Sequence, residues 1–181
     1  MRKVLFVLGQ LTDDDVQWIA ENGVKRVVPP GNTIITMGKQ SDAIFIILDG
    51  EVSVTVEGVR EVARLTCGEI LGEMSLIDAN PPSATITSVT ESTLLEVSKS
   101  LLKRKMAEDI YFSAHFYRAI AVVLSHRLRT ITAVKGGVAG GHLDEQGSME
   151  DELDATVLDN VHLAGARFER MLKKVMGVDE A

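Results

Sequence analysis

The chain has 181 residues, of which 45% are hydrophobic, and its formal net charge at pH 7 is −7, with a pI near 5.1. This length suffices for one buried core and an appendage, and the acidic balance argues against a broad nucleic-acid-binding surface. No apolar stretch approaches the roughly twenty residues of a membrane span. The apolar run in the opening MRKVLFVLGQLTDDD is too short for the core of a signal peptide, and no small-residue cleavage site follows it. We therefore expect a cytoplasmic protein that makes no membrane contact.

The first predicted helix covers residues 12–23. Thr12 is a candidate N-cap, and the three acidic residues after it suit the positive end of a helix dipole. Gly23 is expected at the C′ position, where it ends the helix.

From Val24 onward, short runs rich in β-branched residues replace the helical pattern. The runs are VKRVVP, NTIITM, AIFIIL, EVSVTV, REVARL, SATITSV and TLLEVS, and they are separated by Gly31, Gly38, Gly50, Gly58 and Gly68. Short strands with regular glycine turns are typical of a small antiparallel barrel or roll. The expected fold class is mainly β with flanking helices.

Helical spacing returns after Ser98 and predicts a long helix from about Phe112 to Val134. Apolar residues recur at alternating steps of four and three and form one seam: Ile110, Ala114, Tyr117, Ala121, Leu124, Leu128 and Ile131. Such a seam packs on the roll of its own chain or against a second copy, and both arrangements can hold at different ends. We expect a homodimer through Tyr117, Leu124, Leu128 and Ile131.

The pattern of residues 135–181 predicts a linker and one more helix. GGVAGG and the acidic run from Asp144 to Asp154 predict a flexible, solvated linker. The last helix carries an apolar face of Val157, Val161, Ala164, Phe168, Met171 and Val175. Because an isolated helix of this length is only marginally stable in water, we expect it to dock through Phe168 and Met171. The predicted organisation is a domain over 1–134, a linker over 135–154 and an amphipathic helix over 155–181.

Residues 30–52, PGNTIITMGKQSDAIFIILDGEV, resemble the first half of a cyclic-nucleotide-binding domain of the catabolite activator protein type. The similarity lies in a Pro-Gly pair, an apolar pair, a Gly, an Asp, an apolar run and a further Gly, and it extends from about Leu11 to Val134. The resemblance implies an antiparallel β-roll (a double-stranded β-helix or jelly roll), followed by a long helix.

The same resemblance places a phosphate-binding cassette in GEILGEMSLIDANPPSATI, residues 68–86. In that family a Gly-Glu pair opens a short helix whose backbone N–H groups face the cyclic phosphate. The Glu accepts a hydrogen bond from the ribose 2′-hydroxyl, and an Arg pairs with the phosphate. The implied ligand-binding residues are Gly72, Glu73, Met74, Ser75, Pro82, Ser83, Ala84 and Thr85.

Pro82 departs from the family pattern because it stands where the resemblance places the Arg. Proline brings neither a cation nor an N–H, and a lost charge-assisted hydrogen bond costs about 1.5 to 3 kcal/mol. Three interpretations follow. The cassette binds no nucleotide and is a structural relic, it binds cAMP or cGMP weakly or with a cation from Arg60, Arg64 or the long helix, or it binds another small ligand. Glu73 can also cap its own helix, and Ser83 can bond a neighbouring amide.

The sequence predicts no catalytic or metal site. All four histidines (His115, His126, His142 and His162) follow the strands, so they cannot assemble a metal site inside the roll. Cys67 has no partner for a disulfide or a CxxC motif. The residues after Val134 are too few for a winged helix-turn-helix, so we expect no DNA partner.

Two functions remain after these exclusions. The first is a free-standing, non-enzymatic cyclic-nucleotide-binding-like regulatory module, whose ligand binding is weak or lost because of Pro82. The second is a ligand-independent scaffold that acts through homodimerisation and an unknown protein partner.

Overall fold

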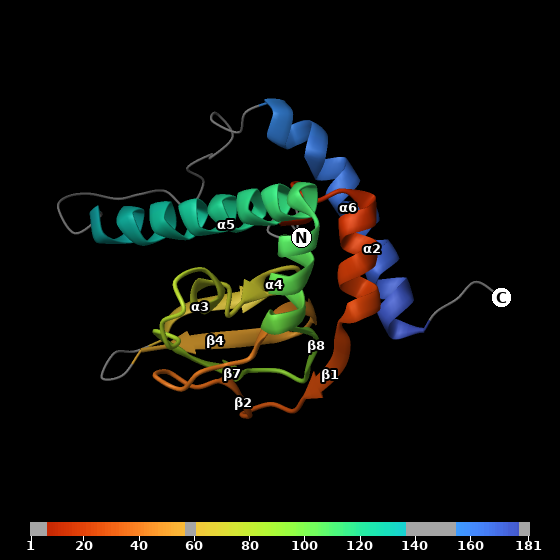
Figure 1. The fold of residues 1–181 in the computed structure, drawn as a ribbon. Coiled ribbons are helices and arrows are strands. Elements are labelled where there is room, and N and C mark those ends of the chain that lie inside the picture. Colours follow the sequence, from red (N-terminus) through yellow and green to blue (C-terminus); the bar gives the residue numbers. More distant parts are fainter. Residues whose placement is uncertain (1–6, 57–60, 137–154, 178–181) are drawn as a thin grey trace.

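The computed structural model describes residues 7–56, 61–136 and 155–177, with side chains described for 7–56, 61–129 and 163–177. Its strands are β1 (Val24–Val28), β2 (Thr33–Ile35), β3 (Ala43–Asp49), β4 (Glu51–Thr55), β5 (Glu61–Thr66), β6 (Ile70–Leu71), β7 (Thr85–Ser88) and β8 (Ser92–Ser98). Its helices are α2 (Asp13–Asn22), α3 (Met74–Ile77), α4 (Lys99–Glu108), α5 (Ile110–Gly136) and α6 (Ala155–Met176). Figure 1 shows the strands as one body, with α5 lying along one side of it.

Two four-stranded antiparallel sheets form the β-roll, in the orders β1-β8-β3-β6 and β2-β7-β4-β5. The predicted fold class is confirmed. Strand β3 is buried on both faces, as its run AIFIIL suggests. Ile44, Ile46 and Leu48 belong to a core shared with the helices, whereas Phe45 and Ile47 belong to a second core inside the roll.

The predicted strand runs correspond to seven of the strands, and the two-residue β6 is the additional one. Gly31, Gly38 and Gly50 lie at strand turns with positive φ, as predicted. Gly58 lies outside the described residues.

Helix α2 begins at the predicted cap. The Thr12 side chain accepts a hydrogen bond from the Asp15 N–H (3.2 Å), and the Asp15 carboxylate accepts one from the Thr12 N–H (2.8 Å). The helix ends at Gly23 as expected, but Gly23 has an extended backbone (φ −92°, ψ 158°) instead of the left-handed one typical of a C′ glycine. Glycine is required here for space, since a Cβ would lie 2.4 Å from Leu95 Cδ1.

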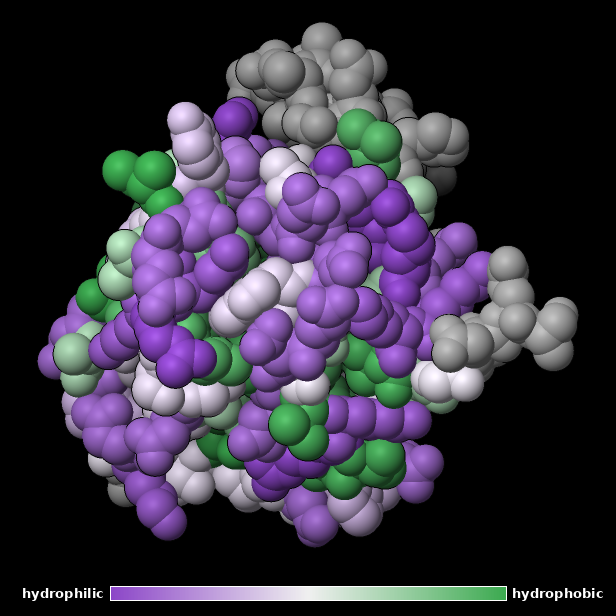
Figure 2. Space-filling model, turned by 45° about the vertical axis from the view of Figure 1, so that its right-hand side comes forward, coloured by the Kyte–Doolittle hydropathy of each residue, from purple (hydrophilic) through white to green (hydrophobic). Residues whose placement is uncertain are grey.

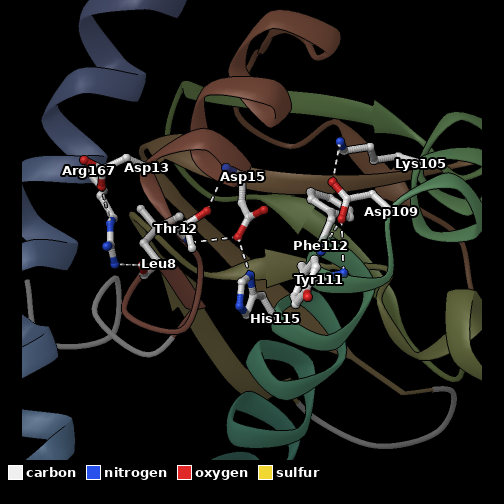
Figure 3. Close-up of polar contacts among 10 residues, drawn as sticks. All are labelled: Leu8, Thr12, Asp13, Asp15, Lys105, Asp109, Tyr111, Phe112, His115 and Arg167. Carbon is white, nitrogen blue, oxygen red and sulfur yellow. Dashed lines mark hydrogen bonds and ion pairs between the residues drawn. The ribbon is translucent and has the colours of Figure 1, made fainter.

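Asp109 separates α4 from α5. Its carboxylate accepts hydrogen bonds from the backbone N–H groups of Tyr111 (3.1 Å) and Phe112 (3.0 Å) and pairs with Lys105 (2.9 Å), as Figure 3 shows. The carboxylate thereby satisfies backbone donors that the first turn of α5 leaves open. The long helix starts two residues earlier than predicted for this reason.

The face of α5 that packs on the rest of the chain consists of Phe112, Phe116, Ala119 and Ile120. The predicted seam lies elsewhere on the helix, because Ile110, Tyr117 and Leu128 expose 77%, 47% and 65% of their surface. The interpretation that this seam packs on its own roll is therefore wrong for these three residues, although Leu124 does contact the core. The side chain of Ile131 lies outside the described residues.

Helix α6 lies beside α2 (Figure 1) and buries Ala164, Phe168 and Met171 in the core shared with the helices. Docking through Phe168 and Met171 is confirmed. The outward face of this region is mainly hydrophilic (Figure 2), which fits an amphipathic helix whose apolar face points inward.

Ion pairs hold α6 against the start of α2. Arg167 donates to the Asp13 carboxylate (2.7 Å) and to the Leu8 carbonyl (3.1 Å), as Figure 3 shows. Arg170 also pairs with Asp13, at 2.9 Å. Nearby, the Asp15 carboxylate lies 2.9 Å from Nδ1 of His115 and so joins α2 to α5.

Of the predicted linker 135–154, only 135 and 136 lie in the described residues, so the division of the chain into a domain, a linker and a helix stays a prediction.

Candidate functional site

The candidate site is the turn from β6 into α3. Gly72 sits between them with φ +80°, and a Cβ there would lie 3.2 Å from the Ala43 carbonyl oxygen and 3.3 Å from Ile35 Cδ1. Both the backbone conformation and the close approach favour glycine. Helix α3 begins at Met74, which confirms the predicted short helix near Glu73.

Glu73 is almost completely buried, with 2% of its surface exposed. Its side chain does not cap α3, so the interpretation of Glu73 as a helix cap is wrong. Its carboxylate instead accepts a hydrogen bond from Nη1 of Arg127, which comes from the long helix α5. Burial raises the pKa of Glu73, and the charge of Arg127 opposes that rise, with a smaller contribution from Lys99.

Arg127 contacts one residue before Gly72 in the sequence and one residue after it. While Nη1 pairs with Glu73, Nη2 donates to the Ile70 carbonyl oxygen at 2.6 Å. One guanidinium therefore connects β6 and the start of α3 to α5. Sequence reasoning had named the long helix as a source of a cation, but it had not singled out Arg127.

A second cation reaches the site from the start of α4. Lys99 is 8% exposed, and its Nζ donates to Ser75 Oγ and to the Ser41 carbonyl, both at 2.6 Å. The Ser75 hydroxyl in turn donates to the Gly72 carbonyl (3.2 Å). Burial lowers the pKa of Lys99, whereas Asp42 and Glu73 raise it. Sequence reasoning missed Lys99, because a single lysine after a strand carries no distinguishing signal.

The other half of the cassette is the turn that leads into β7. Pro82 is half-buried and its carbonyl accepts a hydrogen bond from the Gly38 N–H (2.9 Å), while Thr85 Oγ1 accepts one from the Met37 N–H (3.1 Å). The turn is thereby attached to the segment between β2 and β3. Ser83 is exposed and Ala84 is half-buried.

The other cations proposed from the sequence do not reach the cassette. Arg64 is half exposed and pairs with Glu51 (2.9 Å) and Glu61 (2.6 Å) across β4 and β5. Arg60 lies outside the described residues.

A cavity of about 510 Å³ lies elsewhere, between β1, β8, β3 and the segment after β2. Its lining includes Arg26, Lys39 and Phe45 but no residue of the cassette.

Within residues 7–56, 61–136 and 155–177 there is no cluster of three or more His, Cys, Asp or Glu residues that could hold a metal ion. No helix in the same ranges has the length and apolar character needed to span a bilayer.

Comparison with known proteins identifies the family. Residues 25–109 match the family described as “Cyclic nucleotide-binding domain”. These residues form a cyclic nucleotide-binding domain. The chain is also 31% identical over 99 residues to a “cAMP-dependent protein kinase regulatory subunit” of Yarrowia lipolytica, an alignment that covers 54% of this chain and 26% of that protein. A “Cyclic nucleotide-gated potassium channel” of Rhizobium etli is 38% identical over 72 residues, which cover 40% of this chain and 20% of the channel. The chain thus spans about a quarter or less of these relatives.

Solved structures agree on the fold of this cyclic nucleotide-binding domain. A cyclic nucleotide-binding domain from Methylobacillus flagellatus superposes with a TM-score of 0.69 at 22% sequence identity, covering 78% of this chain and 85% of that one.

Proposed function

We propose that this protein is a regulatory module that binds a cyclic nucleotide, cAMP or cGMP, at the cassette described above. The observation that carries the proposal is the ion pair between Glu73 and Arg127. It connects the carboxylate that the family resemblance assigns to the ribose 2′-hydroxyl with the long helix α5. A ligand that approaches Glu73 changes the environment of this ion pair, and α5 responds.

We propose further that the affinity is low. Pro82 brings no positive charge to the phosphate, and its carbonyl already accepts a hydrogen bond from the Gly38 N–H. A missing charge-assisted hydrogen bond lowers the affinity by about ten- to a hundredfold. The module therefore needs a cyclic nucleotide at higher concentration than a relative with Arg at this position.

Calorimetry with cAMP and cGMP tests the proposal directly. Glu73→Gln should abolish measurable binding, whereas Glu108→Gln, which removes an exposed carboxylate far from the cassette, should leave it unchanged. Trp18, the one tryptophan of the chain, lies against Phe112 of α5, with ring centroids 5.2 Å apart. Its fluorescence should change on binding if α5 moves. Wild-type protein that binds neither nucleotide at millimolar concentration would refute the proposal.

The second candidate function is a ligand-independent scaffold. It is favoured by the exposed apolar residues Tyr117 and Leu128 on α5, which suit a contact with a second copy or with a protein partner. Light scattering with and without cAMP separates the two functions. A dimer that forms equally in both conditions, together with flat calorimetry, supports the scaffold.

A further inference from the structure

Lys99 is a buried ammonium group whose hydrogen-bond acceptors are both neutral. Its Nζ donates to a carbonyl and a hydroxyl, and no ion pair with a carboxylate is found for it among the described residues. Buried charges in proteins are normally paired, because an unpaired one is expensive to desolvate. The position of Lys99 therefore calls for a negative charge that the folded chain itself does not supply at close range.

Of the two cations that reach the cassette, Lys99 is the one that has no carboxylate within ion-pair distance among the described residues. Arg127 and Glu73 pair with each other, whereas Nζ of Lys99 donates to Ser75 of α3 and to the Ser41 carbonyl. Asp42 and Glu73 influence Lys99 through Coulomb interactions without a hydrogen bond to its Nζ. The charge of Lys99 is therefore able to act on an anion bound at the cassette.

The contacts of Lys99 also lead directly into the cassette. Lys99 donates to Ser75 Oγ, and Ser75 donates to the Gly72 carbonyl. This chain of hydrogen bonds fixes the turn from Gly72 to Ser75. A charge placed there acts on a ligand without touching it, because Coulomb interactions are weakly screened in a buried environment.

We infer that Lys99 supplies, from the buried side of the cassette, the positive charge that a bound cyclic phosphate requires and that residue 82 does not provide. This inference rests on the proposed function, and it concerns a phosphodiester monoanion as the ligand. It makes Lys99 an electrostatic and positioning residue of the site.

Calorimetry with cAMP on four proteins tests the inference. Lys99→Gln keeps a hydrogen-bond donor but removes the charge, and should weaken cAMP binding about tenfold. Lys99→Arg keeps the charge and should bind within about threefold of wild type. The matched control is Lys25→Gln, which removes an exposed lysine on β1 and should leave affinity unchanged.

The Pro82→Arg background separates charge from mere structural support. With Arg at 82 the phosphate already has a cation, so Lys99→Gln should cost clearly less affinity than it does in the natural background. An equal loss in both backgrounds would assign Lys99 a purely structural role and overturn the inference. So would equal cAMP affinity of wild type and Lys99→Gln, which would leave the proposed function intact. Flat titrations of both wild type and Pro82→Arg would overturn the two proposals together.

A measurement on the wild-type protein covers the case in which Lys99→Gln does not fold. Because burial lowers the pKa of Lys99, affinity for cAMP should fall as the pH rises toward the ordinary lysine pKa and Lys99 loses its proton, whereas Lys99→Arg should keep its affinity because arginine stays charged. Asp42, Glu73 and Lys103 are the other charged groups that act on Lys99. Identical pH profiles of the two proteins would overturn the inference.

Discussion

Replacing Arg127 with Gln removes the guanidinium that pairs with the Glu73 carboxylate and holds the Ile70 carbonyl. Only 3% of the Glu73 side chain and 27% of the Arg127 side chain are exposed. Breaking a buried ion pair by removing one partner costs about 3 to 5 kcal/mol. Because Arg127 keeps some contact with water, we expect a loss near the lower limit, about 3 kcal/mol of unfolding free energy at neutral pH.

The pH dependence of this loss identifies its cause. Burial raises the pKa of Glu73 above its ordinary value of 4.5, and Arg127 opposes the rise. Without Arg127 the pKa rises further. A carboxyl group whose pKa is raised by folding contributes stability that is fully present below its unfolded pKa and is lost as the pH rises through its folded pKa. Arg127→Gln should therefore recover part of its deficit, relative to wild type, as the pH falls from neutral toward about 5.

Urea denaturation followed by circular dichroism measures these effects. The matched control is Arg129→Gln, which removes an exposed arginine two residues further along α5 and should stay within about 0.5 kcal/mol of wild type. Glu73→Gln combined with Arg127→Gln should be more stable than Arg127→Gln alone at neutral pH, because the double variant leaves no unpaired carboxylate buried at position 73. Equal denaturation midpoints for Arg127→Gln and Arg129→Gln would refute the reasoning.

Three further predictions concern the ligand, the dimer and α6. Pro82→Arg should raise cAMP affinity by about ten- to a hundredfold in calorimetry, and no gain would mean that the cassette is closed to the ligand. Leu128→Glu should convert a dimer to a monomer in light scattering without loss of thermal stability, and a monomeric wild type would remove the dimer proposal. Leu124 is unsuitable for this test, because it also contacts the core of its own chain. Phe168→Ala should lower the unfolding free energy by about 3 kcal/mol in urea denaturation, and an unchanged midpoint would show that α6 contributes little to stability.

The β-roll was predictable because its signals are local. The β-branched runs and the glycines between them specify strands and turns within a few residues of each position, and Thr12 specifies a helix start in the same way. Strand β6 was missed because two residues carry no period. The buried face of α5 was misassigned because that helix has apolar residues on more than one face, and periodicity does not tell which of them meets the roll.

The cassette was only half predictable for a related reason. Gly72 and Glu73 lie next to each other in a recognisable pattern, whereas Arg127 and Lys99 arrive from positions 54 and 24 residues away. Their roles depend on how α4 and α5 fold back over the roll, which no local pattern records. The absence of a cation at residue 82 could be seen in the sequence, but the cations that surround α3 could not.

Strand β3 contributes side chains to two hydrophobic cores, and this limits which fragments of the chain can fold on their own. Its alternate side chains face the inside of the roll and the layer of α2, α4, α5 and α6. A fragment that stops at Ser98 would keep α2 but lose α4, α5 and α6, and it would therefore expose part of the core around Ile44, Ile46 and Leu48. Strand β3 is already paired on both edges in this fragment. Such a fragment should aggregate instead of remaining a smaller functional roll. We therefore expect the strands and their helical cover to unfold together, in one cooperative transition.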